Sequence, residues 1–165
     1  MTAFAEPIAT GAHAAELRRK LFGSWTMLSW TVEDLATGET APALGESPAG
    51  SIVYTPDGRV MVLVLRSDRP FPAELVPTDA EKIALYDSMF AYAGTYTVDP
   101  DKVSHHIDMS WNQAWTGTTQ IRLLRLDGDR LTYTSVPARN PMTGRDCVHH
   151  VVFRRVLQEM EATEA

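Results

Sequence analysis

Residues 117–136 read GTTQIRLLRLDGDRLTYTSV, two runs rich in β-branched, aromatic and aliphatic residues that meet at Asp127-Gly128-Asp129. The Asp-Gly pair tolerates the positive φ angles that a short hairpin loop demands. The sequence therefore predicts a hairpin whose two strands are Gly117–Leu126 and Arg130–Val136.

The same alternation of turn residues and short β-rich runs continues along the chain in both directions. It divides the chain into eight predicted strands, with little helical periodicity between them. The further turns are Ala36-Thr37-Gly38, Pro56-Asp57-Gly58, Val98-Asp99-Pro100-Asp101 and Met142-Thr143-Gly144. The other predicted strands are Trp25–Asp34, Ser51–Tyr54, Arg59–Arg66, Tyr92–Val98, Lys102–Trp111 and Arg145–Val156.

Two helices are expected. Pro77-Thr78-Asp79 supplies a cap, and apolar residues recur at helical spacing as far as Ala91, so one helix is predicted near 79–91. A shorter one, Ala14–Phe22, leads into the first strand. The barrel domain then spans 14–157, and 1–13 and 158–165 are expected to be a disordered arm and tail. The predicted loops are Ala41–Gly50 and Ser67–Val76, which are rich in Pro, Gly or Ala.

The number of strands and the short turns favour one all-β architecture over another. Eight consecutive antiparallel strands leave two unpaired edges unless the sheet closes, so we expect an eight-stranded antiparallel up-and-down barrel. A β-sandwich is the alternative, but it needs long crossover connections, and only Ser67–Val76 with its following helix could serve as one. An eight-stranded barrel is wide enough to hold one small ligand.

Composition excludes several classes of protein. The length of 165 residues suits one domain, and a single cysteine, Cys147, cannot form an internal disulfide. The longest strictly apolar run, 60–65, falls far short of the roughly 18 residues of a membrane helix. A net charge of −6 without a long basic run argues against nucleic acid as a partner. Residues 1–11 lack the features of a secretory signal, so we expect a cytoplasmic protein.

Several motifs in their order along the chain carry a resemblance to a known family. Gly23-Ser24-Trp25 is similar to the lipocalin Gly-x-Trp motif, and Phe153-Arg154-Arg155 lies where lipocalins place an Arg that packs over that Trp. Together with the segments Ile52–Arg59, Tyr92–Tyr96, Trp115–Arg122 and Leu126–Leu131, they resemble the lipocalin-like domain family of the calycin barrels.

The resemblance implies a barrel with a ligand cavity and covers roughly residues 20 to 156. A tight Asp127-Gly128 hairpin replaces the middle lipocalin motif, which indicates an intracellular bacterial branch. Lipocalin relatives are mostly carriers of hydrophobic molecules, and some intracellular ones resemble cofactor-free cyclases and isomerases. The fold alone does not choose between these activities.

Alternation along each strand predicts which side chains face the cavity. In Lys102–Trp111 the odd-numbered residues, which include His105, Met109 and Trp111, are expected to face inward. For Gly117–Leu126 the choice stays open between the set with Gln120 and Arg122 and the set with Ile121 and Leu123. The remaining inward sets are Tyr92, Gly94, Tyr96 and Val98, then Leu131, Tyr133 and Ser135, then Cys147, His149, Val151 and Phe153.

The resulting cavity is mostly apolar, with a few side chains that end in a polar group, as is typical of small-molecule pockets. A His in an apolar cavity can move protons near neutral pH, and a Tyr hydroxyl can polarise a carbonyl, although both are also common as packed wall residues. No cofactor and no metal site is expected. The predicted catalytic residues are His105, His149, Tyr96 and Tyr133. The predicted substrate-binding residues are Tyr92, Met109, Trp111, Trp115, Gln120, Arg122 and Phe153.

Three functions remain as hypotheses. The first is a cofactor-independent enzyme that cyclises or isomerises a hydrophobic, natural-product-like substrate by proton transfer in the cavity. The second is a carrier that binds a lipophilic small molecule without chemistry. A structural module is the third. A homodimer is also plausible through Leu28, Trp30 and Val32, which alternation places on the outer face of the first strand.

Overall fold

A computed structural model describes residues 6–139 and 144–157 of the chain. The predicted turn at Met142-Thr143 and the predicted tail at 158–165 lie outside these residues, as do residues 1–5 of the predicted arm. No helix of the described part is long and apolar enough to cross a membrane.

Eight long antiparallel strands form a closed barrel, which confirms the predicted fold class. The sheet order follows the chain from β3 to β8, and β10 pairs with both β8 and β1, which closes the barrel. Two short strands, β2 and β9, add to β1 and β10 at one end. The bounds are β1 Gly23–Asp34, β2 Thr40–Pro42, β3 Ala49–Tyr54, β4 Arg59–Leu65, β5 Met89–Val98, β6 Lys102–Ser110, β7 Thr119–Asp127, β8 Arg130–Ser135, β9 Ala138–Arg139 and β10 Asp146–Arg155.

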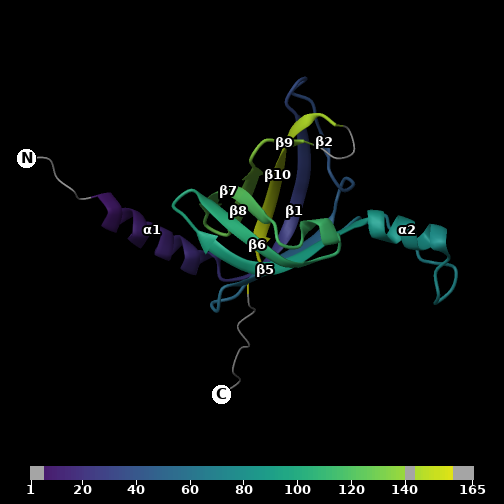
Figure 1. The fold of residues 1–165 in the computed structure, drawn as a ribbon, viewed down its shortest axis with the longest axis horizontal. Coiled ribbons are helices and arrows are strands. Elements are labelled where there is room, and N and C mark those ends of the chain that lie inside the picture. Colours follow the sequence, from purple (N-terminus) through teal and green to yellow (C-terminus); the bar gives the residue numbers. More distant parts are fainter. Residues whose placement is uncertain (1–5, 140–143, 158–165) are drawn as a thin grey trace, which may run out of the picture.

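The two helices extend from the barrel on opposite sides (Figure 1). Helix α1, Glu6–Leu21, begins earlier than predicted, so part of the expected arm is helical. Helix α2, Asp79–Asp87, starts with the predicted cap: Thr78 accepts from the Glu81 backbone, and the Glu81 carboxylate accepts from the Thr78 backbone. It ends before the predicted Ala91, because the chain enters β5 at Met89. A short 3₁₀ helix, η1 Gln113–Trp115, follows β6.

One end of the barrel is closed by Trp25, whose side chain is fully buried. Its indole nitrogen donates to the carbonyl of Leu21 at the end of α1, 2.9 Å away. The guanidinium of Arg155 lies over the indole, with Cζ 4.1 Å from the ring centroid. Arg155 also donates to the carbonyls of Lys20 and Phe22, so it ties α1 to the last strand. The stacked Trp–Arg pair that the lipocalin resemblance implied is therefore present.

A β-bulge in β1 reverses the outward orientation predicted for Trp30. The pairing with β10 skips Leu28, since Met27 faces Phe153 and Ser29 faces Val152. The extra residue turns Trp30 into the barrel, where it packs against the core. Of Leu28, Trp30 and Val32, the three residues of the predicted dimer face, Leu28 is 41% exposed. Val32 pairs with the inward-facing His149 and so faces inward as well. The apolar outer face predicted for a homodimer does not form.

A second bulge, in β6, reverses the orientation predicted for Met109. Ala93 of β5 pairs with Met109, whereas Gly94 pairs with Ile107, so Asp108 is the extra residue. Met109 consequently points outward and is 58% exposed. Gly94 makes the close approach of the two strands possible, because a Cβ there would lie 2.0 Å from the His106 carbonyl oxygen.

Candidate functional site

His105 lies at the centre of a buried hydrogen-bond network inside the barrel. Its Nδ1 atom is 2.6 Å from the hydroxyl of Tyr92, and its Nε2 atom is 2.6 Å from the hydroxyl of Tyr54. The Tyr54 hydroxyl is in turn 2.5 Å from that of Tyr133. The four side chains come from β3, β5, β6 and β8, so the network connects opposite walls of the barrel.

Burial keeps every member of this network uncharged at neutral pH. Desolvation lowers the pKa of His105 well below its ordinary value, and the positive charge of Arg122 acts in the same direction. Desolvation also raises the pKa of Tyr54, Tyr92 and Tyr133. A neutral imidazole donates at one nitrogen and accepts at the other, so one tyrosine donates to His105 and the other accepts from it. The hydrogen bonds between Tyr92, His105, Tyr54 and Tyr133 can therefore all run in one direction or all in the other, and every group stays neutral in both cases.

The inward set of β7, which the sequence left open, is the one with Gln120 and Arg122. Gln120 pairs with His105, and Arg122 pairs with Val103 on one side and Ser135 on the other. Val103, His105 and Ser135 are all buried on the inside of the barrel. Gln120 and Arg122 are half-buried, so solvent reaches them from the open end.

His149 also faces the interior, nearer the open end. Its Nδ1 atom accepts a hydrogen bond of 3.0 Å from the indole nitrogen of Trp30. Since an indole nitrogen only donates, the neutral ring carries its proton on Nε2, which lies 3.8 Å from the Cys147 sulfur. Burial lowers the pKa of His149, and the charge of Arg122 contributes. With its accepting nitrogen occupied, His149 is not poised as a base in this conformation.

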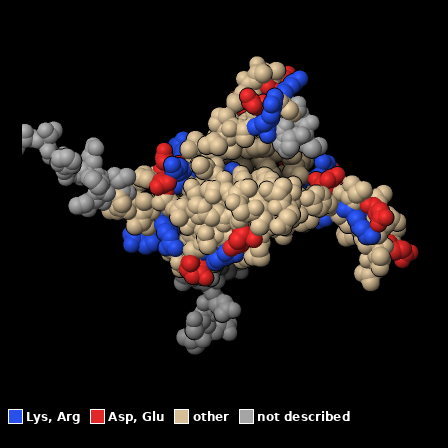
Figure 2. Space-filling view, viewed as in Figure 1, with Lys and Arg blue, Asp and Glu red and all other residues tan. Residues whose placement is uncertain are grey.

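Aromatic rings from several elements meet above the network at the open end. Phe90 contacts Trp30 across the barrel, with ring centroids 5.1 Å apart. Trp115 lies 5.1 Å from Phe90 and 6.2 Å from Tyr92, and Trp111 lies 4.7 Å from Phe90. All except Tyr92 are half-buried. The surface is hollowed between the end with β2 and β9 and the central strands, as Figure 2 shows. The half-buried aromatic cluster and the polar side chains below it make up the open half of the barrel.

Three predicted site residues lie away from this open half, and one of them, Met109, is on the outer face of the barrel. Tyr96 is near the closed end, where its hydroxyl donates to the Thr55 carbonyl at 3.0 Å and Arg18 lies over its ring. Phe153 is buried in the core against Tyr133. The structure therefore brings together His105, Tyr133, Tyr92, Gln120, Arg122, Trp115 and His149, and it places Tyr96, Phe153 and Met109 elsewhere.

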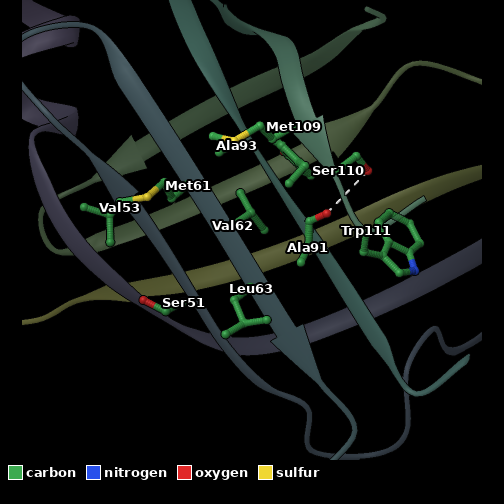
Figure 3. Close-up of a pocket in the computed structure, with 11 residues that line it drawn as sticks. Ser51, Val53, Met61, Val62, Leu63, Ala91, Ala93, Met109, Ser110 and Trp111 are labelled. Atoms are coloured by element: carbon green, nitrogen blue, oxygen red, sulfur yellow. Dashed lines mark hydrogen bonds between the residues drawn. The ribbon is translucent and has the colours of Figure 1, made fainter. Parts of the chain in front are cut away.

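An open groove of about 480 Å³ lies on the outer face of the barrel (Figure 3). Outward-facing side chains of β3 to β6 line it, including Met61, Leu63 and Met109. Trp111 stands at its rim and also contacts the inner aromatic cluster. The groove carries few polar groups and no titratable pair, so its chemistry differs from that of the barrel interior.

Three residues of the site were missed from the sequence. Tyr54 lies two residues after the apolar Ile52 on β3, and both are buried. The two-residue period of a strand could therefore have indicated that Tyr54 faces inward. Phe90 fitted the helical spacing of the segment before it and was assigned to the helix. Trp30 was placed outside because a bulge depends on how two distant strands pair, which one strand's pattern does not reveal.

The arrangement suits a small molecule with one polar group. The aromatic cluster offers apolar contact area, and the Tyr92 hydroxyl and the Arg122 guanidinium can orient a polar atom of the ligand. In the part of the chain that the structure describes, no three His, Cys, Asp or Glu side chains gather in a way that could hold a metal ion.

Comparison with known families agrees with the barrel and its motifs. Residues 22–156 match the model of the lipocalin-like domain. The matched segment contains every strand of the barrel. A comparison with curated proteins finds no match. Since the match spans most of the chain and the closed eight-stranded barrel is present, the protein belongs to the lipocalin-like domain family.

Proposed function

We propose that the protein binds a hydrophobic small molecule in the open half of the barrel and isomerises or cyclises it by moving a proton, without a cofactor. The observation that carries the proposal is the hydrogen-bonded chain from Tyr92 through His105 to Tyr54 and Tyr133. It lies directly below the aromatic cluster, within ring contact of Trp115.

Binding is supported by the nature and the exposure of the surrounding side chains. Trp30, Phe90 and Trp115 are large, apolar and only half-buried. Aromatic side chains of this kind stabilise a bound ring through contact area and edge-to-face packing. The three side chains therefore provide most of the affinity in this proposal.

Proton transfer is assigned to Tyr92. It is 6% exposed, whereas Tyr54, His105 and Tyr133 are at most 2% exposed, and its ring contacts Trp115, so it is the member of the network next to the substrate in this proposal. Tyr92 donates its proton to an oxygen of the substrate as negative charge develops there. The Tyr92 phenolate, held by a hydrogen bond from Nδ1–H of the neutral His105, then takes a proton from a substrate carbon. The substrate gains an O–H bond and loses a C–H bond, so Tyr92 regains its proton and the isomerisation balances.

A carrier without chemistry is the second candidate. Both imidazoles have their accepting nitrogens occupied, by Tyr hydroxyls at His105 and by the Trp30 indole at His149. A network whose hydrogen bonds are all satisfied also serves to hold a barrel wall in one conformation. In that case ligand binding would be independent of the network's protons.

Deuterium exchange separates the two candidates. We would incubate 2-tetralone, an apolar ketone with acidic α-hydrogens, with the protein in D₂O and follow α-deuteration by NMR. The proposal predicts faster exchange than in buffer, with a loss of about a hundredfold in Tyr92→Phe. Tyr96→Phe is the matched control, since its hydroxyl bonds a backbone carbonyl at the closed end. Binding without acceleration would establish the carrier, and absence of binding would reject both.

The location proposed for the protein is the cytoplasm. Cys147 is a free, buried thiol, and unpaired cysteines are usual in reducing compartments. Immunolocalisation or fractionation of expressing cells tests this directly, and recovery outside the cytoplasm would reject it.

A further inference from the structure

We infer that the ligand of the open half carries an acidic or enolic oxygen, and that Arg122 supplies the positive charge that recognises it. The inference rests on the proposed binding function and adds the chemical class of the ligand: an apolar, aromatic-sized anion such as a carboxylate, phenolate or enolate.

The position of Arg122 in the sheet directs its side chain into the barrel. Its cross-strand neighbours Val103 and Ser135 are buried on the inner face, and cross-strand partners share a face. The guanidinium also lowers the pKa of both His105 and His149, which lie at different heights in the barrel. Arg122 therefore points into the barrel, where its charge acts on both imidazoles.

No carboxylate of the described residues pairs with Arg122. Its Nη1 atom donates to the backbone carbonyl of Ile121, 3.3 Å away, and the guanidinium also lies within hydrogen-bond reach of the Tyr92 hydroxyl. The ion pairs of the other arginines, such as Arg59 with Asp108 and Arg155 with Asp129, lie on the outside of the barrel. The buried polar residues of the described part are Ser88, His105 and Ser135, none of them acidic.

An arginine that is partly removed from water and lacks a carboxylate is left with unused donors. A guanidinium forms its strongest hydrogen bonds with anionic oxygens, often two at once. Around it lie the Tyr92 hydroxyl, whose raised pKa the guanidinium partly opposes, and the amide of Gln120. Arg122, Gln120 and Tyr92 thus provide polar groups on the inner face, next to the aromatic cluster, so they fit a ligand that is apolar at one end and anionic at the other.

Two fluorophores with the same aromatic skeleton test the inference. 8-Anilinonaphthalene-1-sulfonate carries a negative charge, and N-phenyl-1-naphthylamine is its uncharged counterpart. We would measure the affinity of each for the full chain and for Arg122→Met, with Arg125→Met as the matched control. Arg125 is on the same strand, exposed on the outer face of β7. Competition between the two probes establishes that they share a site.

The expected result is that Arg122→Met loses affinity for the anionic probe and keeps its affinity for the uncharged one. Arg122→Met should weaken binding of the sulfonate by tenfold or more, whereas the amine should change by less than about twofold and Arg125→Met should change neither. Arg122→Lys should restore part of the difference. Equal effects on both probes, or an equal effect of Arg125→Met, would overturn the inference and leave the binding function intact. Failure of both probes to bind the natural chain would instead reject the binding function itself.

Discussion

The Nδ1 atom of His105 and the hydroxyl of Tyr92 are joined by a hydrogen bond of 2.6 Å inside the barrel. This bond connects a fully buried imidazole to the most accessible member of the network. Because the other ring nitrogen is bonded to Tyr54, both sides of His105 are fixed. His105 is therefore part of the structural core and also the centre of the proposed proton chain.

Stability should depend on pH through this ring. Burial lowers the pKa of His105 well below 6.5, so the unfolded chain binds a proton there before the folded protein does. The free energy of unfolding should reach its full value above about pH 6.5. As the pH falls below 6.5 it should decrease, by up to about 1.4 kcal/mol per pH unit for one such ring. His149 shifts in the same direction and adds to the slope. Denaturant titrations between pH 5 and pH 7 measure the effect.

NMR titration of the folded protein isolates the contribution of His105. Because burial holds the pKa of His105 well below its ordinary value, its ring signals should show no protonation step near pH 6.5. A normal midpoint for His105 would contradict the buried, neutral assignment.

Loss of Arg155 should destabilise the closed end. Arg155→Met removes a cation 4.1 Å from the centroid of Trp25 and the donors to the carbonyls of Lys20 and Phe22. We expect a loss of about 2 kcal/mol, because the contact is largely shielded from water. Thermal unfolding measures it, with the exposed neighbour Arg154→Met as control. Equal effects of the two substitutions would contradict a specific Trp–Arg contact.

Gly94→Ala should be among the most damaging small substitutions. The new methyl group would meet the backbone of His106 and Ile107 in the neighbouring strand, which cannot move without breaking the bulge. Overpacking of this kind costs about 1–3 kcal/mol, and here we expect the upper part of that range. Gly11→Ala is the contrast, since it is helical with open space around it and should be neutral or stabilising. A Gly94→Ala protein as stable as the natural one would show that the close approach is absent.

Thr78→Ala should affect only α2. The substitution removes the capping box, which contributes about 1 kcal/mol to a helix, but α2 has no buried residues to couple it to the barrel. Hydrogen exchange of the α2 amides should accelerate while the melting temperature of the barrel stays unchanged. A clear fall in melting temperature would mean that the contact between Tyr86 of α2 and Trp111 couples the helix to the barrel.

Local chemistry was sufficient to predict much of the fold. The turn at Asp127-Gly128 forms as expected, with Gly128 at a φ of +57°, and Thr78 caps its helix. These features depend on neighbouring residues alone. The closure of the barrel followed from the number of strands and from the need to pair their edges.

The errors arose where distant strands decide the local geometry. The bulges at Leu28 and Asp108 change the alternation after them, and so Trp30 turns inward and Met109 outward. Phe90 has apolar neighbours at helical spacing, yet its pairing with Val64 makes it part of β5. Likewise, the inward set of β7 became clear only from its partners, because both of its faces carry polar and apolar residues.

The position of a bound apolar ligand tests the central claim most directly. We would titrate the labelled protein with N-phenyl-1-naphthylamine and follow the indole N–H signals of the tryptophans and the methyl signals of the methionines by NMR. Binding in the open half predicts large shifts for Trp30 and Trp115 and small shifts for Trp25, Met61 and Met109. Shifts confined to Met61 and Met109, in the outer groove, would contradict binding inside the barrel.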